Sequence, residues 1–196
     1  MKFVLATQNP KKLKEMSAIL SDLGVEVVSE ADLGVKIEVE ETGETFAENS
    51  LLKAKAVMEA TKLPAIADDS GLCVNALNGG PGVYSARYAG EGHDDAANNA
   101  KLLDALKDVP GEKRTAQFRT SVALIRRGMP AVTADGSVEG RILHSPQGEN
   151  GFGYDPLFYY EPLKKSFAQL TPEEKNSVSH RRRALESLCD KLRAEK

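Results

Sequence analysis

The sequence predicts an α/β protein built on a mixed β-sheet. Short apolar, β-rich runs are interspersed along the chain with amphipathic segments of helical period. Glycine-rich stretches, such as NGGPG at 78–82, mark turns between them. The composition, 41% hydrophobic and 28% charged, is that of an ordinary globular protein, and 196 residues suffice for one well-buried core. We therefore expect a single domain over residues 1–196.

The N-terminal segment predicts a strand followed by a helix. Residues 2–6 (KFVLA) form the kind of short apolar run that makes a buried strand. Asn9 is suited to cap a helix and Pro10 to its first position. Apolar residues at helical spacing follow, and Gly24 can end the helix.

The next segment predicts a second strand, helix and strand. Val35 to Glu40 (VKIEVE) alternates between apolar and charged residues, which indicates a half-buried strand. Thr45 and Glu48 form a capping box for a helix that runs to about Thr61. Pro64 to Ala67 is another short apolar run of the kind that forms a strand.

The rest of the chain continues in the same alternating manner. The expected elements are a helix at 94–107, β-rich runs at 114–127 and 131–143 that form a hairpin or a long pair, a glycine-rich loop at 148–155, a short helix from Thr171, and a last helix capped by Ser179.

The composition also excludes some classes of function. The formal net charge of −3 argues against a broad nucleic-acid surface. No apolar run is long enough to span a bilayer, and the N-terminus lacks a signal-peptide layout. Cys73 and Cys189 show no metal-ligand spacing, so we expect free thiols and a cytoplasmic protein.

Basic residues stand at two helix starts, where the helix dipole disfavours them. Lys11 and Lys12 begin the first helix, and the run His180 to Arg183 begins the last. Each such charge opposes the dipole by about 0.3–1 kcal/mol. Thr7-Gln8-Asn9 joins a strand to the first helix start, a geometry that presents N–H groups to phosphate. The pattern indicates an anion site, although solvated lysines and a plain cap would look the same.

Carboxylates stand where the chain otherwise enters a core. Asp68 and Asp69 end an apolar run, and buried adjacent carboxylates need N–H groups, a basic partner or a metal. Further oxygens come from Glu38, Glu40 and Glu41. Such hard ligands suit Mg²⁺, which takes one or two carboxylates and completes its shell with water and phosphate. The alternative is an Asx turn at the end of the strand.

Two more features have both a functional and a structural interpretation. Lys53 and Lys55 face different ways on the second helix, so one can reach a site while the other is solvated. In GFGYDP (151–156), Phe152 offers a stacking platform for a base, or simply anchors the loop by burial.

Six motifs together resemble the inosine/xanthosine triphosphate pyrophosphatase family of the RdgB type. They are TQNPKK (7–12), EETGETFAEN (40–49), ADDSGL (67–72), GGPGVYSARYAG (79–90), GFGYDP (151–156) and SVSHRRRAL (177–185). The resemblance runs nearly from end to end. Gln8 stands where many relatives have glycine.

The resemblance implies a role for each matching position. The substrate's triphosphate would be bound by Thr7, Gln8, Asn9, Pro10, Lys11 and Lys12. Catalysis would fall to Asp69 as general base, with Lys53 and Glu41. Mg²⁺ would be bound by Glu40 and Asp69. The nucleotide and base pocket would be formed by Phe152, Gly153, Tyr154, Asp155, Lys175, His180 and Arg181, and Ser70 would be a further substrate contact.

The resemblance further implies an elongated, two-lobed α/β fold around a long mixed sheet, with the active site in the cleft between the lobes. It implies a Mg²⁺-dependent homodimer that hydrolyses nonstandard purine nucleoside triphosphates to monophosphate and pyrophosphate. Asp68 would support the turn beside Asp69. Two alternatives are a Maf-like pyrophosphatase for modified pyrimidine nucleotides and a non-catalytic nucleotide-binding protein. GFGYDP and SHR disfavour the first, and the acidic and basic site residues disfavour the second.

Overall fold

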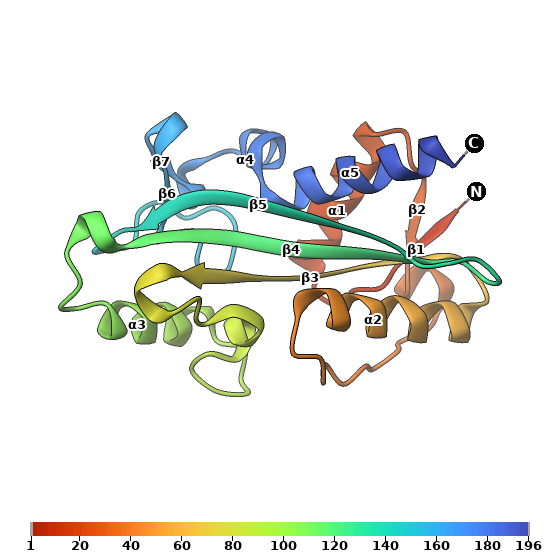
Figure 1. Cartoon of the computed structure of the whole chain (residues 1–196), viewed down its shortest axis with the longest axis horizontal. Coiled ribbons are helices and arrows are strands. Elements are labelled where there is room, and N and C mark those ends of the chain that lie inside the picture. The colour runs from red at the N-terminus through yellow and green to blue at the C-terminus, as the bar shows by residue number, and fades with distance from the viewer. Residues whose placement is uncertain (1, 196) are drawn as a thin grey trace. The chain divides into compact units, whose positions relative to one another are not determined.

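A computed structural model describes residues 2–195 and confirms the α/β class with a mixed sheet. Seven strands lie in the order β2-β1-β3-β4-β5-β6-β7 (Figure 1). Their bounds are β1 Phe3–Leu5, β2 Val27–Ser29, β3 Ala65–Val74, β4 Thr115–Ile125, β5 Val132–Ile142, β6 Phe158–Tyr160 and β7 Lys165–Ser166. β1 pairs in parallel with β2 and β3, whereas β6 pairs antiparallel with β5 and β7.

Residues 2–195 form five α-helices. They are α1 Pro10–Asp22, α2 Phe46–Thr61, α3 Asp95–Ala105, α4 Pro172–Val178 and α5 His180–Ala194. Of these, α1, α2 and α3 connect strands, and α4 and α5 follow the last strand. No helix among residues 2–195 is both long and apolar enough to cross a membrane.

The chain divides into two compact units. Unit 1 comprises the residues up to Asp69, Thr120–Gly136 and the residues from His180 onward. Unit 2 comprises Ser70–Arg119 and Ser137–Ser179. Strands β3, β4 and β5 contribute residues to both units.

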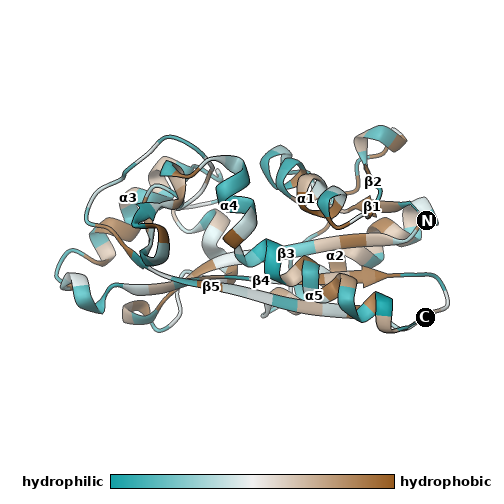
Figure 2. Cartoon of the chain, turned by 90° about the horizontal axis from the view of Figure 1, so that it is seen from above, coloured by the Kyte–Doolittle hydropathy of each residue, from teal (hydrophilic) through white to brown (hydrophobic). Residues whose placement is uncertain are grey.

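Each unit has its own apolar core. In unit 1, α1 and α5 cover one face of the strands and α2 covers the opposite face (Figure 1). Helix α5 carries both hydrophilic and hydrophobic stretches in Figure 2, and its apolar residues Ala184, Leu185 and Leu188 are buried. In unit 2, the core includes a cluster of aromatic rings in which Phe118 and Phe158 lie 4.5 Å apart.

The helix starts follow the sequence signals. The Asn9 carboxamide oxygen accepts hydrogen bonds from the backbone N–H groups of Lys11 and Lys12, which makes Asn9 the cap of α1. Both bonds of the predicted capping box between Thr45 and Glu48 are present at α2.

The predicted strand at Val35–Glu40 is wrong. The N–H of Ile37 donates to the Glu30 carboxylate at 2.9 Å, and its C=O accepts from the Gln8 side chain at 2.8 Å. Side chains thus satisfy this backbone instead of a neighbouring strand. The short strand β2 (Val27–Ser29) takes the edge position beside β1.

The predicted end of the third strand is also wrong. β3 does not stop at Ala67 but runs through Asp68 and Asp69 to Val74, so the two carboxylates stand in mid-strand and not in an Asx turn. The strand continues because both carboxylates have buried partners, which removes the cost that made a turn the expected alternative.

Candidate active site

Asp69 lies at the centre of a buried polar cluster in unit 1. Its Oδ1 is 3.3 Å from Lys53 Nζ, and its Oδ2 accepts from Asn49 Nδ2 at 3.1 Å. Thr120 Oγ1 on the neighbouring strand β4 donates to the Asp69 carbonyl oxygen at 3.0 Å. The residue is only 6% exposed. Both the side chain and the backbone of Asp69 are therefore held.

Lys53 joins Asp69 to a second carboxylate. Its Nζ lies 2.6 Å from Glu41 Oε1, so it is shared between Glu41 and Asp69. Burial lowers the pKa of Lys53, but the charges of the surrounding carboxylates outweigh this, and the pKa is raised. Burial raises the pKa of Asp69, against the opposing effect of Lys53. Lys53 therefore stays charged, and it lies beside Asp69, whose carboxylate burial makes costly to ionise.

Asp68 has a different set of partners. Its Oδ2 accepts from Arg181 Nε and Nη2 at 3.2 and 3.1 Å, and Lys12 Nζ lies 3.3 Å from the same oxygen. Arg181 also donates to Glu15. Burial lowers the pKa of Lys12 despite the attraction of Asp68. Keeping Lys12 protonated in this buried place therefore costs free energy, and a bound phosphate would offset that cost.

The segment from Thr7 to Lys12 joins β1 to α1. Asn9 N–H donates to Thr7 Oγ1 at 3.3 Å, and Gln8 reaches Ile37, so both side chains have structural contacts. Gln8, Asn9, Pro10 and Lys11 are exposed, while Thr7 and Lys12 are half-buried. The segment presents a helix N-terminus with a nearby ammonium group, an arrangement that suits phosphate.

The predicted residues of unit 2 form a second cluster. Lys175 Nζ lies 2.6 Å from Asp155 Oδ2 and 4.6 Å from the centre of the Phe152 ring. The same carboxylate accepts from the Phe152 N–H at 2.9 Å. Tyr154 donates through its hydroxyl to the Ser85 carbonyl at 2.7 Å, and burial raises its pKa.

Helix α3 holds this loop from outside the motif. Asn99 Nδ2 donates to the Gly153 carbonyl and the Gly153 N–H donates to Asp95 Oδ2, both at 2.8 Å. Gly153 has φ +60°, a conformation that favours glycine.

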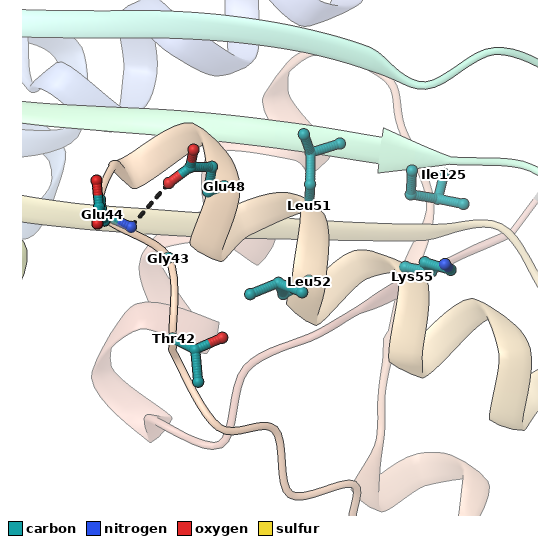
Figure 3. A pocket seen from close by; sticks show the side chains of 8 residues that line it. All are labelled: Thr42, Gly43, Glu44, Glu48, Leu51, Leu52, Lys55 and Ile125. Carbon is teal, nitrogen blue, oxygen red and sulfur yellow. Dashed lines mark hydrogen bonds between the residues drawn. The ribbon is translucent and has the colours of Figure 1, made fainter.

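The structure separates residues that the sequence left equivalent. Lys53 turns toward Asp69, whereas Lys55 lines a cavity of about 510 Å³ on the other side of α2 (Figure 3). Glu41 reaches Lys53, whereas Glu40 is exposed. Ser70, half-exposed, follows Asp69 on β3, and His180 is buried at the start of α5.

Sequence reasoning missed the supporting residues. Asn49, Thr120, Asp95 and Asn99 carried no signal of charge or period that set them apart. Asn49 lies in the motif EETGETFAEN, four residues after the helix cap Thr45, and this position is the one signal in the sequence that points to it.

A metal ion can be tested against these donors. Among residues 2–195, no group of three or more His, Cys, Asp or Glu side chains is arranged to hold a metal. Mg²⁺ usually takes only one or two protein carboxylates and completes its shell with water and phosphate. Asp69 and Glu41, two hard-oxygen donors that share Lys53, fit such a partial set.

A sequence model described as the Ham1 family matches residues 3–191. The chain belongs to the Ham1 family. A Ham1 protein from Staphylococcus aureus has a solved structure that is similar to this chain, with 44% identity, full coverage of both chains and a TM-score of 0.87. A structure from Mycobacterium abscessus named nucleoside-triphosphatase / dITP/XTP pyrophosphatase is 49% identical, covers 96% of this chain and 98% of its own, and has a TM-score of 0.76.

Curated relatives of this Ham1-family chain are also named dITP/XTP pyrophosphatase. Proteins named dITP/XTP pyrophosphatase from Desulforamulus reducens and Bacillus subtilis are 53% and 50% identical to it. The alignments cover 98% and 97% of this chain and 96% of each relative. The family resemblance inferred from the six motifs is thereby confirmed.

Proposed function

We propose that this Ham1-family protein hydrolyses nonstandard purine nucleoside triphosphates, ITP, dITP and XTP, to the monophosphate and pyrophosphate. Such an activity removes deaminated purines from the nucleotide pool before they enter DNA or RNA. The relatives named dITP/XTP pyrophosphatase, at about 50% identity over nearly the whole chain, support the reaction. The observation that carries it is the buried Asp69 carboxylate beside Lys53 and Glu41, with Lys12 nearby on α1.

Water attacks the α-phosphorus and pyrophosphate leaves. The protein's part is positioning and charge compensation, since phosphoryl transfer needs little covalent help. Asp69 orients the water and accepts its proton, and Asn49 and Thr120 hold it in place. Lys12 and Lys53 offset the charge that develops on the departing pyrophosphate.

Mg²⁺ is part of the proposal. Asp69 with Glu41 or Glu40 would hold it, and the family resemblance also favours a metal. When bound, Mg²⁺ supplies a positive charge that polarises phosphate oxygens and lowers the pKa of water. The neighbouring lysines remain responsible for the outer phosphates.

The second cluster is proposed to bind the base. Phe152 offers its ring for stacking, while Gly153, Tyr154, Asp155 and Lys175 offer polar edges. His180 and the backbone N–H groups at the start of α5 can donate hydrogen bonds to the 6-oxo group of xanthine and hypoxanthine. Adenine carries an amino group at this position, which is itself a donor. Guanine shares the 6-oxo group but carries an amino group at position 2, so its rejection requires crowding or a missing acceptor near that position. XTP and ITP are therefore the good substrates, and GTP and ATP the poor ones.

The proposal extends to the setting of the enzyme. We expect a cytoplasmic homodimer whose partner is the small-molecule nucleotide, with no role in binding nucleic acid or membranes. Gel filtration with light scattering tests the dimer, and the wild-type substrate panel below tests the nucleotide.

Pyrophosphate release is measured with ITP, XTP, GTP, ATP and modified pyrimidine triphosphates in the presence of Mg²⁺. We expect release from XTP and ITP that far exceeds that from the others. A preference for modified pyrimidines would favour the Maf-like alternative, and binding without release would favour the non-catalytic one.

The variant Asp69→Asn tests the role of the Asp69 charge in the reaction. It keeps the shape of the side chain and removes its charge, so kcat should fall by at least ~10²-fold, the lower range of general-base contributions. The fold should persist, because the change neutralises a carboxylate that burial makes costly to ionise, and Lys53 keeps Glu41 as its partner. Near-normal turnover in Asp69→Asn would remove Asp69 from the mechanism.

A further inference from the structure

Asn49 is a fully buried polar residue with a partner at each end of its amide. Its Oδ1 accepts from the backbone N–H of Gly43 at 2.8 Å, and its Nδ2 donates to Asp69 Oδ2 at 3.1 Å. The orientation of the amide is therefore determined, because the Gly43 N–H can only donate and an ionised carboxylate can only accept. Asn49 is one of few side chains that can satisfy both neighbours at once.

Gly43 is packed so tightly on helix α2 that a larger residue does not fit. A Cβ at this position would lie 2.7 Å from Asn49 Oδ1 and 2.7 Å from Glu48 Cβ. The backbone that follows is fastened to the same helix, since the N–H groups of Glu44 and Thr45 both donate to Glu48 Oε2 (Figure 3 shows the first). The segment at 43–45 is thus attached to the helix by three backbone donors.

Only Thr42 separates the attached segment from Glu40 and Glu41, the acidic residues of the candidate site. Glu41 reaches Lys53 at 2.6 Å, and Lys53 reaches Asp69 Oδ1 at 3.3 Å. Asn49 donates a hydrogen bond to the other carboxylate oxygen of Asp69, Oδ2. The contacts form a closed ring from Gly43 through Asn49, Asp69 and Lys53 to Glu41 and back along the chain.

We propose that Asn49 is a positioning residue that sets the rate of the chemical step. Its amide fixes the rotation of the Asp69 carboxylate and holds the acidic segment before Gly43 at a set distance from it. The inference rests on the proposed pyrophosphatase activity and adds a residue to it. It predicts that losing Asn49 affects kcat far more than KM, because the triphosphate is held by residues such as Lys12.

The test measures kcat and KM for XTP in wild type, Asn49→Ala, Asn49→Asp, Gly43→Ala and the double variant Gly43→Ala/Asn49→Ala. Misplacing reacting groups by about 1 Å costs ~10²-fold, so we expect Asn49→Ala to lower kcat by about that factor with little change in KM. Gly43→Ala should lower kcat as well, because it displaces the amide without altering it. The double variant should be no slower than the slower single variant, since both changes break the same contact.

Asn49→Asp separates the two ends of the amide. It keeps the acceptor for the Gly43 N–H but places a carboxylate against Asp69 Oδ2. If attachment of the segment were all that mattered, this variant would keep the wild-type kcat. We expect it to be as slow as Asn49→Ala.

Asn98→Ala is the matched control. Asn98 is also a buried helical asparagine that uses both ends of its amide, but its partners are the Ala89 N–H and the Ala86 carbonyl. It should lose thermal stability and keep kcat. If Asn49→Ala behaves in the same way, or raises KM alone, Asn49 has only a structural role and the inference is overturned.

Failure of the inference can be told from failure of the proposed function. If wild type releases no pyrophosphate from any triphosphate, the proposed function fails. The urea unfolding of wild type, the two alanine variants and their double variant then tests the contact between Gly43 and Asn49 on which the inference rests. Losses of stability that overlap support the shared contact, and strictly additive losses overturn it.

Discussion

At the scale of single residues, Asp68 and Asp69 explain how one strand carries two adjacent buried carboxylates. Successive side chains of a strand point to opposite faces. Asp68 therefore meets Lys12 from α1 and Arg181 from α5, and Asp69 meets Lys53 from α2. Each charge has its own cations, so the repulsion that the sequence alone suggests is offset on both sides of β3.

Lys12 gives a prediction about pH. Burial lowers the pKa of its ammonium group below the ordinary value of 10.5, and Asp68 opposes this only in part. A lysine binds phosphate when protonated, so kcat/KM should fall as pH rises through that lowered pKa. Lys12→Arg should shift this alkaline limb upward, since a guanidinium keeps its proton beyond about pH 12.

The measurement is the kcat/KM profile for XTP from about pH 7 to about pH 11 in wild type and Lys12→Arg. The pKa of Lys53 is raised, so Lys53 stays charged while Lys12 titrates and does not contribute to the alkaline limb of the profile. An unchanged alkaline limb in Lys12→Arg would mean that another group titrates there.

Arg181 gives a prediction that decides between two roles. The sequence suggested that Arg181 contacts the base, but its side chain is 2% exposed and donates hydrogen bonds to Asp68 and Glu15. Removing one partner of a buried pair costs about 3–5 kcal/mol, here less because Lys12 remains beside Asp68. We expect Arg181→Ala to lower Tm and to lower kcat/KM for ITP, XTP, GTP and ATP in proportion.

Arg182→Ala is the control for this prediction. Arg182 pairs with Asp22 and Glu186, whose side chains are 65% and 45% exposed, so its loss should change Tm little. If Arg181→Ala instead narrows the gap between ITP and ATP, the base-reading role predicted from the sequence stands.

At the scale of elements, the sequence predicted what local chemistry determines. The starts of α1 and α2 follow from Asn9 and from the capping box of Thr45 and Glu48, because these side chains bond only to their own backbone neighbours. Where the outcome depends on distant partners, prediction failed. The alternation at Val35–Glu40 resembles a strand, but β2 occupies the sheet edge.

The same distinction applies to the candidate site. Charged residues at unfavourable positions, such as Lys12 and Asp69, could be singled out because a charge needs a partner. Neutral residues that orient them could not. Asn49 and Asn99 are ordinary helical asparagines until the strand or loop opposite them is known.

Helix α3 gives a prediction at this scale. Asp95 and Asn99 lie one turn apart and bind the backbone N–H and the backbone C=O of Gly153, so they fix the loop that carries Phe152. Asn99→Ala removes a neutral hydrogen bond worth about 0.5–1.5 kcal/mol, so KM should rise by up to ~10-fold for every purine triphosphate, with the ranking unchanged.

Lys101→Ala is the comparison, because Lys101 lies on the same helix and donates instead to the Tyr88 carbonyl. Its KM values should match those of wild type. A change in the ranking of purines in Asn99→Ala would mean that Asn99 itself contacts the base.

At the scale of the whole molecule, buried charges are compensated within the chain. The buried residues that form ion pairs include Asp68, Asp69, Asp155, Lys175 and Arg181. Each unit also has its own apolar core. Asp68, Asp69 and Glu41 therefore have lysine or arginine partners within the chain, and we expect the fold not to need a metal cation to hold them.

Removal of divalent metal should accordingly abolish activity and leave the fold intact. Lys53 already bridges Glu41 and Asp69, so chelation with EDTA should not leave these carboxylates to repel one another. We expect pyrophosphate release from XTP to be lost and to return on addition of Mg²⁺. The Tm should fall by less than about 4 °C, the upper shift that ~1 kcal/mol gives a domain of this size. Calorimetry with and without EDTA, beside the activity assay, makes the comparison. A much larger fall in Tm would show that the metal stabilises the fold, and full activity in EDTA would remove the metal from the proposed mechanism.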